Sequence, residues 1–263
     1  MKNVSGALKE LFYSLGIFTR TLRGIGAFFL RGQAAHHLLI LQILFTFVEA
    51  LGIASLLALG IGAVVNVIGI PTLSRIGQQQ LIYPLLILII TRELGPLLTA
   101  FIISARSATA IATEMAGMVV SHEVEAYLSI GVDPIEYLAV PRFLGVTISM
   151  FLLNIFFSIF GLAGSFAVAQ LFSSLPADVY FTNLLQSLTV QDIFISVVKS
   201  IVFGMIVSIT GIIYGLAVVQ SSTEIPVAGL KAVGSSFALC IIVDILLSAM
   251  YYMVIGLRLW PAS

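Results

Sequence analysis

Charged side chains gather in one stretch of this otherwise apolar chain, between positions 91 and 142. Two of them, Arg92 and Glu93, are neighbours inside a long hydrophobic run. An ionised group at the bilayer centre costs at least about 2.5–3.5 kcal/mol, so such residues are retained for a function or as partners of one another. Lys199 and Asp244 lie in two further hydrophobic runs. Opposite charges offset one another's desolvation only if their helices converge. We therefore predict that Glu93, Lys199 and Asp244 meet around a cavity.

The elements that must hold these charges are membrane-spanning helices. Of the 263 residues, 60% are hydrophobic and 9% are charged, whereas an ordinary soluble domain is about 25% charged. A helix needs roughly 20 apolar residues to cross the hydrocarbon. Five runs satisfy this requirement: 38–68, 81–104, 138–172, 193–219 and 235–257. We predict an all-α polytopic membrane protein with five transmembrane helices. The formal net charge of zero argues against a nucleic-acid partner, because phosphate binding requires surplus Lys and Arg.

Pro96 follows the first charged pair closely. A proline inside a helix removes one backbone hydrogen bond and clashes with the carbonyl four residues back, which predicts a kink. A kink beside Arg92 and Glu93 suits the wall of a cavity. The alternative is that the two side chains only pair with each other or with a neighbouring helix. For Lys199, snorkelling to the membrane surface is an equal alternative. Glu49, in the first run, is either a polar group facing a cavity or a protonated acid.

Residues 1–34 are predicted to form an amphipathic helix that lies in the membrane surface. Apolar side chains recur there at spacings of three and four: Leu8, Leu11, Phe12, Leu15, Phe18, Leu22, Ile25 and Phe29. A signal peptide is the alternative, but Arg20 and Arg23 interrupt any apolar core. The basic residues of this segment place the N-terminus in the cytoplasm under the positive-inside rule. Five spans then place the C-terminus outside.

A short polar helix is predicted between the second and third hydrophobic runs, on the cytoplasmic side. Ser121 is its expected N-cap, and Glu123 suits the positive end of its dipole. Gly131 is expected to end it in a left-handed conformation. Asp133 and Pro134 then restart a helix as its N-cap and its first residue.

Five ordered motifs form the most specific signal in the chain. They read RELGP at 92–96, SARSATAIATEMAGM at 104–118, EVEA at 123–126, GVDP at 131–134 and PR at 141–142. Together they resemble the MlaE permease family, the membrane subunits of ABC-type lipid transporters that work with MCE-domain proteins. The resemblance extends loosely from about residue 42 to the C-terminus.

The resemblance implies a homodimeric permease in the bacterial inner membrane that moves phospholipids or related lipids between the inner and outer membranes. Two ATPase subunits and a ring of MCE-domain proteins would complete the transporter, and residues 35–263 would form the permease domain. The segment near 121–131 would be the coupling helix that docks on the ATPase, through Ser121, Glu123, Glu125, Leu128, Gly131, Asp133 and Pro134. The residues expected at the lipid cavity are Arg92, Glu93, Pro96, Lys199 and Asp244.

The sequence gives less support to other functional classes. The chain lacks a Gly-x-x-x-x-Gly-Lys-Ser/Thr phosphate loop, so ATP and Mg²⁺ are expected in the partner ATPase and no cofactor in this chain. A proton-coupled secondary transporter is the alternative, with intramembrane acids as proton carriers, but we find no internal repeat of the kind such folds often show. The three histidines form no metal pattern and no nucleophile elbow occurs, which disfavours a hydrolase.

Overall fold

The computed structural model describes residues 14–26, 28, 33–172, 176–219 and 221–259. Within these ranges the regular structure is entirely helical, without a strand. Five helical runs among the described residues are long and apolar enough to cross a membrane: His37–Arg75, Gln79–Val120, Ile135–Leu171, Val190–Leu216 and Ser222–Met253. The predicted all-α fold with five spans is therefore confirmed.

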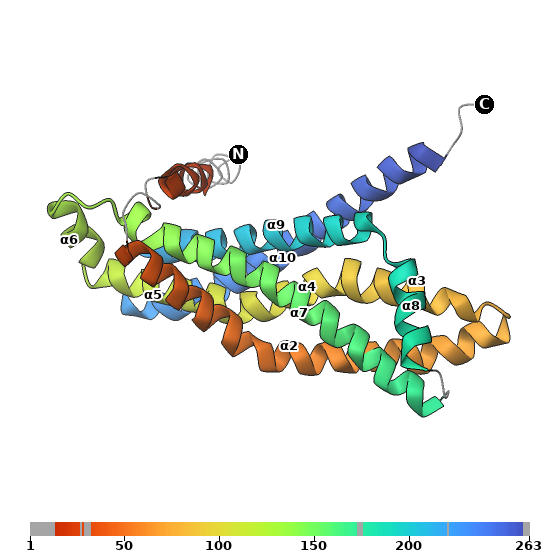
Figure 1. Cartoon of the computed structure of the whole chain (residues 1–263). Helices are drawn as coiled ribbons and strands as arrows, with labels where there is room; N and C mark the ends of the chain where they lie inside the picture. Colours follow the sequence, from red (N-terminus) through yellow and green to blue (C-terminus); the bar gives the residue numbers. More distant parts are fainter. Residues whose placement is uncertain (1–13, 27, 29–32, 173–175, 220, 260–263) are drawn as a thin grey trace. The chain divides into compact units, whose positions relative to one another are not determined.

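The helices follow one another with short connections (Figure 1). A helix over 14–26 is followed by α2 (Gln33–Arg75), η1 (Gln79–Leu81), α3 (Ile82–Leu86), η2 (Ile87–Leu94), α4 (Gly95–Ile103), η3 (Ser104–Ala108), α5 (Thr109–Val120), α6 (Glu123–Ser129), η4 (Ile135–Ala139), α7 (Val140–Phe172), α8 (Ala177–Ser187), α9 (Val190–Leu216), η5 (Ser222–Glu224) and α10 (Ile225–Leu259). The segments η2, η3 and η4 are π-helical, with a wider turn than an α-helix. The second span therefore consists of consecutive helical pieces.

The chain divides into two compact units. Unit 1 comprises Met1–Thr46, Ile103–Ser149 and Gly204–Leu239, and unit 2 comprises Phe47–Ile102, Met150–Phe203 and Cys240–Ser263. Each of the five long helical runs contributes one part to unit 1 and one part to unit 2. The predicted intramembrane charges belong to unit 2, and the predicted coupling segment belongs to unit 1.

The first span is longer than its apolar run predicts. The run ends at residue 68, but α2 continues through Pro71 to Arg75. The hydroxyl groups of Thr72 and Ser74 donate to backbone carbonyls one turn earlier, at 2.6 and 2.7 Å. These hydrogen bonds support the last turns of α2 on both sides of the proline, whose own nitrogen cannot donate.

The fourth span begins at Val190, three residues before its apolar run. Its start is a reciprocal capping box. The Asp192 N–H donates to Thr189 Oγ1 at 3.3 Å, and the Thr189 N–H donates to Asp192 Oδ2 at 3.2 Å. Polar residues that cap a helix thus extend it beyond the apolar stretch.

The helix over 14–26 packs one face against the beginning of α7, within unit 1. Ile17 and Thr21 are buried on that face, and Phe18 contacts Phe143 edge to face at 6.3 Å between ring centroids. Leu15 is exposed. The predicted apolar positions Leu8, Leu11, Phe12 and Phe29 lie outside the described residues. A helix at 14–26 agrees with the predicted pattern, and its location at the membrane surface stays a prediction.

Helices α2 and α7 approach each other closely in unit 2, at glycines. A Cβ atom at Gly62 would collide with the carbonyl oxygen of Gly161, and one at Gly164 would collide with the backbone of Leu59. Small residues at such crossings allow two helix backbones to approach within the membrane. The glycines therefore allow α2 to pack closely against α7. Helix α7 also contacts α9, through Asn154 and Ser196.

The close crossing predicts a difference between two nearby glycines. Gly62→Ala is expected to destabilise the chain by about 1–3 kcal/mol, because the added methyl group overpacks a backbone contact. Gly60 faces open space, and alanine is the better helix former. Gly60→Ala should therefore leave stability unchanged or raise it. Thermal unfolding in detergent, followed by reaction of the buried Cys240 thiol with a fluorescent reagent, measures both variants. Equal stability of the two would contradict the packing argument.

Candidate functional site

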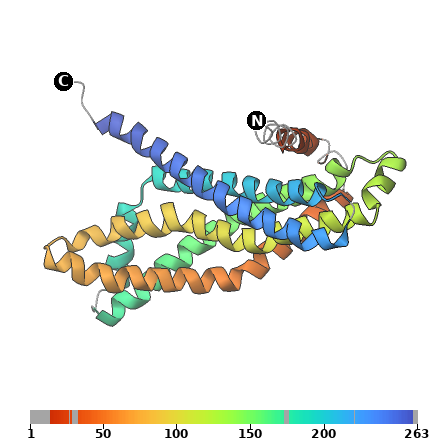
Figure 2. The ribbon, with the colours of Figure 1, turned by 180° about the vertical axis from the view of Figure 1, so that it is seen from behind.

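Lys199 is the centre of a buried ion-pair network in unit 2. Its side chain is completely buried, and its ammonium group donates to Glu93 Oε2 at 2.6 Å and to Ser248 Oγ at 2.8 Å. Asp244 Oδ1 lies 2.8 Å from the same Nζ atom. The structure thus brings Glu93, Lys199 and Asp244 together, from η2, α9 and α10, as the sequence predicted, and a cavity around them stays a prediction. Figures 1 and 2 both show α9 and α10 side by side.

Arg92 joins the network from the same π-helical segment as Glu93. Its Nε atom lies 3.3 Å from Glu93 Oε1, and its Nη1 atom lies 3.4 Å from Asp192 Oδ1. Its Nη2 atom donates to the hydroxyl of Tyr252. The guanidinium group also lies 4.8 Å from the ring centroids of Tyr251 and Tyr252, within the range of a cation–π interaction. Arg92 is therefore bonded to groups on α9 and α10, and Lys199, which lies on α9, is bonded to groups on η2 and α10.

The local backbone explains how η2 can present two adjacent charges. Arg92 and Glu93 lie in the last half of the π-helical segment, which ends directly before Gly95 and Pro96. The predicted kink site thus coincides with a widened helical turn, a feature that is frequent at functional sites. Gly95 packs on α7, because a Cβ atom there would lie 3.0 Å from Asn154 Oδ1. Pro96 itself is buried in α4, and its role at a lipid cavity stays a prediction.

Four members of the network were missed by the sequence reasoning: Asp192, Ser248, Tyr251 and Tyr252. The spacing of polar residues along α10 is a signal that could have identified two of them. Asp244, Ser248 and Tyr252 are four residues apart, so they lie on one face of a helix. Following that face from Asp244 would have identified the hydroxyl groups that bond Lys199, Glu93 and Arg92.

A second polar chain connects α7 to the network. Asn154 Nδ2 donates to Ser196 Oγ at 2.8 Å, and Ser196 Oγ donates to the carbonyl of Thr91 at 2.8 Å. These three residues also line a cavity of about 240 Å³, whose other walls are mostly apolar. The charged residues of the network contact one another directly, and both cavities described in unit 2 are lined by other residues.

The predicted coupling segment forms a separate, exposed site in unit 1. Helix α6 is present as predicted, but its N-cap is His122, with a left-handed backbone at φ 61°, and not Ser121. This end of α6 has no side-chain capping hydrogen bond, and the Ser121 hydroxyl instead donates to Glu123 Oε1 at 2.9 Å. Gly131 has the predicted left-handed conformation, with φ 79°. Asp133 Oδ1 accepts the N–H of Ile135 at 2.9 Å, which confirms Asp133 as the cap of the next helix.

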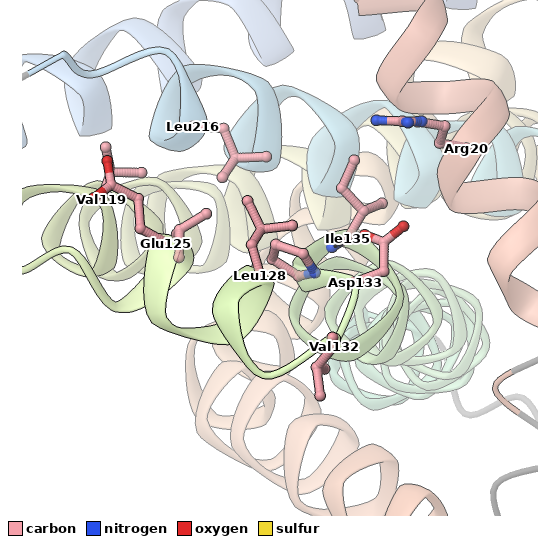
Figure 3. Close-up of a pocket in the computed structure, with 11 residues that line it drawn as sticks. Arg20, Val119, Glu125, Leu128, Val132, Asp133, Ile135 and Leu216 are labelled. Carbon is pink, nitrogen blue, oxygen red and sulfur yellow. Dashed lines mark hydrogen bonds between the residues drawn. The ribbon is translucent and has the colours of Figure 1, made fainter.

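Helix α6 and the residues that follow it form one side of a cavity of about 550 Å³ in unit 1. Five of the seven predicted coupling residues line it: Glu125, Leu128, Gly131, Asp133 and Pro134. Figure 3 shows Arg20, from the helix at 14–26, across this cavity from Glu125 and Leu128. Leu128 is 60% exposed. An exposed leucine beside acidic residues and an open cavity gives α6 the character of a surface for a partner.

Five candidate spans, of which the second, fourth and fifth are joined by an ion-pair network, indicate a multi-pass membrane protein. A family model described as "Permease MlaE" matches residues 39–250. The chain is 30% identical to a "Probable ABC transporter permease protein" of Rickettsia prowazekii over 217 residues, 82% of this chain and 84% of the relative. A protein of the same description from Synechocystis is 28% identical over 243 residues, 89% of each chain. "Protein TRIGALACTOSYLDIACYLGLYCEROL 1, chloroplastic" of Arabidopsis thaliana is 25% identical over 204 residues, 78% of this chain and 58% of that protein.

The chain therefore belongs to the MlaE permease family, which confirms the resemblance of its motifs. It is a permease subunit of the ABC type, and this class implies a separate ATPase partner. Membership in the family weighs against a proton-coupled secondary transporter.

Proposed function

We propose that this chain is the permease subunit of an ABC transporter that moves phospholipids or related lipids between the inner and outer membranes. The family match over residues 39–250 carries the proposal, and one relative's name refers to a diacylglycerol lipid. The chain itself makes and breaks no bond. ATP and Mg²⁺ belong to the ATPase, whose hydrolysis cycle changes the conformation of the permease.

The five spans differ in how much of each is buried within the chain, and this difference supports a homodimer. Only 11% of the α10 window and 22% of the α2 window are buried within the chain, against 44–56% for the other three spans. The ion-pair network reaches the uncovered side of α10, where Tyr252 is 52% exposed. A second copy would cover α2 and α10 and enclose a lipid cavity between the two protomers.

Charged residues of the network, together with the nearby Pro96, would form the wall of that cavity. Arg92, Glu93, Pro96, Lys199 and Asp244 are the residues that we assign to it. Paired charges can hold a polar headgroup at this depth without leaving an isolated ion in the hydrocarbon, which would be costly. The apolar side chains of α2 and α10 would contact the acyl chains.

Helix α6 is the proposed coupling helix. Its exposed Glu123, Glu125 and Leu128 would contact the ATPase, and the cavity that Gly131 and Asp133 line would receive a side chain of that partner. Because an ATPase works in the cytoplasm, α6 and the N-terminus lie on the cytoplasmic side and the C-terminus lies in the periplasm. The ring of MCE-domain proteins would then be on the opposite side, toward α8.

Purification of the tagged chain in mild detergent, followed by mass spectrometry of proteins and lipids, tests this assignment. We expect an ABC ATPase, an MCE-domain protein and bound phospholipid in the wild-type sample, and a second copy of the chain by native mass spectrometry. A chain that purifies reproducibly without an ATPase and without phospholipid would contradict the proposal.

A further inference from the structure

A cavity of about 420 Å³ in unit 2 is separate from the ion-pair network. It lies where the end of α2, η1, α3, the end of α7 and α8 meet, and α8 packs beside α3 (Figure 1). The first span ends at Arg75 and the second begins at Gln79, and the third ends at Leu171 and the fourth begins at Val190. Helix α8 lies in the second of these connections. The cavity is therefore at the ends of spans, at the depth of lipid headgroups.

The lining of this cavity is rich in uncharged hydrogen-bonding groups. Among the described residues that line it are four amides and a serine, Asn66, Gln79, Gln80, Asn183 and Ser74, and none of the lining residues is charged. Amide and hydroxyl side chains offer both donors and acceptors. A phosphate group, in contrast, is usually bound by charge-assisted donors such as Arg or Lys.

Asn66 supplies an independent sign that a partner is missing. Its side chain is almost completely buried, and its Nδ2 atom donates to the carbonyl of Ser165. Its Oδ1 atom is buried without a hydrogen-bond partner in the described part of the chain. A buried acceptor that stays unpaired is costly, so natural proteins rarely leave one without a water or a ligand.

Two tyrosines also line this cavity. Tyr83 and Tyr180 contact each other edge to face at 5.6 Å between ring centroids, and Asn183 Nδ2 donates to the Tyr83 hydroxyl at 3.4 Å. Burial raises the pKa of the Tyr180 phenol, so its hydroxyl stays uncharged at physiological pH. Amphipathic aromatic rings of this kind suit the membrane interface, where one side is apolar and the other is wet.

We propose that this cavity binds an uncharged, hydroxyl-rich group, such as the sugar or glycerol headgroup of a membrane lipid. Amide and phenol groups can donate to hydroxyl groups and accept from them, and Gln79 and Gln80, which line the cavity, are exposed. The depth of the cavity makes a lipid the favoured source, and a free sugar is the other source of the same chemistry. The proposal requires only that the chain is embedded in a membrane. It does not depend on which lipid the transporter moves.

The test uses the full chain in phosphatidylcholine nanodiscs and a diacylglycerol that carries one neutral hexose and a photoreactive acyl chain. We expect crosslinks to peptides of α2, α3 and α8, and competition by the unlabelled hexosyl lipid but not by phosphatidylcholine. Asn183→Leu and Gln80→Leu should each weaken binding by about tenfold through the loss of hydrogen bonds. Gln78→Leu is the matched control, because Gln78 is exposed but does not line the cavity.

The remaining outcomes separate the possible ligands. Competition by free hexose supports the same chemistry and assigns a soluble sugar as its source. Loss of binding in Arg75→Gln would overturn the proposal, because it would show recognition of a phosphate by the neighbouring cation. Equal labelling by a photoreactive phosphatidylcholine, or equal effects of Gln78→Leu and Gln80→Leu, would also overturn it. None of these readouts involves transport or an ATPase, so the result is independent of the function proposed above.

Discussion

Replacing Lys199 by methionine is expected to destabilise the folded chain by about 3–5 kcal/mol, the usual cost of removing one partner of a buried ion pair. Methionine retains the length and the apolar stem of lysine but removes the ammonium group. Glu93 and Asp244 would then lose the cation that lies 2.6 and 2.8 Å from their oxygen atoms. Arg92 would be left as the one cation of the network beside three carboxylates.

Thermal unfolding of purified protein, followed by size-exclusion chromatography after heating, measures this loss. Lys231→Met is the matched control, because Lys231 is an exposed lysine on α10. Adding Glu93→Gln and Asp244→Asn to Lys199→Met should restore part of the stability, since neutral amides remove the uncompensated charges. If Lys199→Met and Lys231→Met unfold at the same temperature, the network does not stabilise the packing of η2, α9 and α10.

Leu128→Asp is expected to weaken the association with the ATPase by at least about 30-fold, the equivalent of a 2 kcal/mol hot spot. The side chain is apolar, exposed and next to an open cavity. An aspartate there would have to be desolvated in the interface and would add to the charge of Glu123 and Glu125. The fold of the permease should be unaffected, because Leu128 is exposed in the isolated chain.

Recovery of the ATPase with the tagged permease measures this effect, and ATP hydrolysis by the purified complex provides a second readout. Leu185→Asp is the control, since Leu185 is an equally exposed leucine on α8, at the end of the spans where we place the periplasm. A Leu128→Asp variant that retains the ATPase, or a Leu185→Asp variant that loses it, would contradict the assignment of α6 as the coupling helix.

The five spans could be predicted because long apolar runs have no other stable place than a membrane. Their ends were less predictable, because polar residues decide where a helix stops. The Thr189 and Asp192 capping box extends α9 before its apolar run, and hydroxyl hydrogen bonds extend α2 past Pro71. At α6 the hydroxyl of Ser121 has two possible partners, a backbone N–H and the nearby Glu123, and the sequence does not show which one it bonds.

Three charged residues of the candidate site, Glu93, Lys199 and Asp244, could be predicted to pair because isolated ions are costly in hydrocarbon. The charged Asp192, which lies at the start of α9, was missed. The neutral part could not be predicted, because Ser248 and Tyr252 are common in spans and carry no such penalty. Their contacts depend on the rotation of α10 about its axis. Rotation is set by the packing of whole helices, and a single apolar run contains little information about it.

ATP-dependent lipid transfer by the reconstituted transporter tests the central claim most directly. Proteoliposomes that contain the permease, its ATPase and its MCE-domain partner would be mixed with acceptor vesicles, and transfer of a fluorescent phospholipid would be recorded with ATP, with a non-hydrolysable analogue and with a proton gradient alone. We predict transfer with ATP only, lost in Leu128→Asp and retained in Leu185→Asp. Transfer driven by the proton gradient without ATP, or unaffected by Leu128→Asp, would contradict a lipid permease powered through α6.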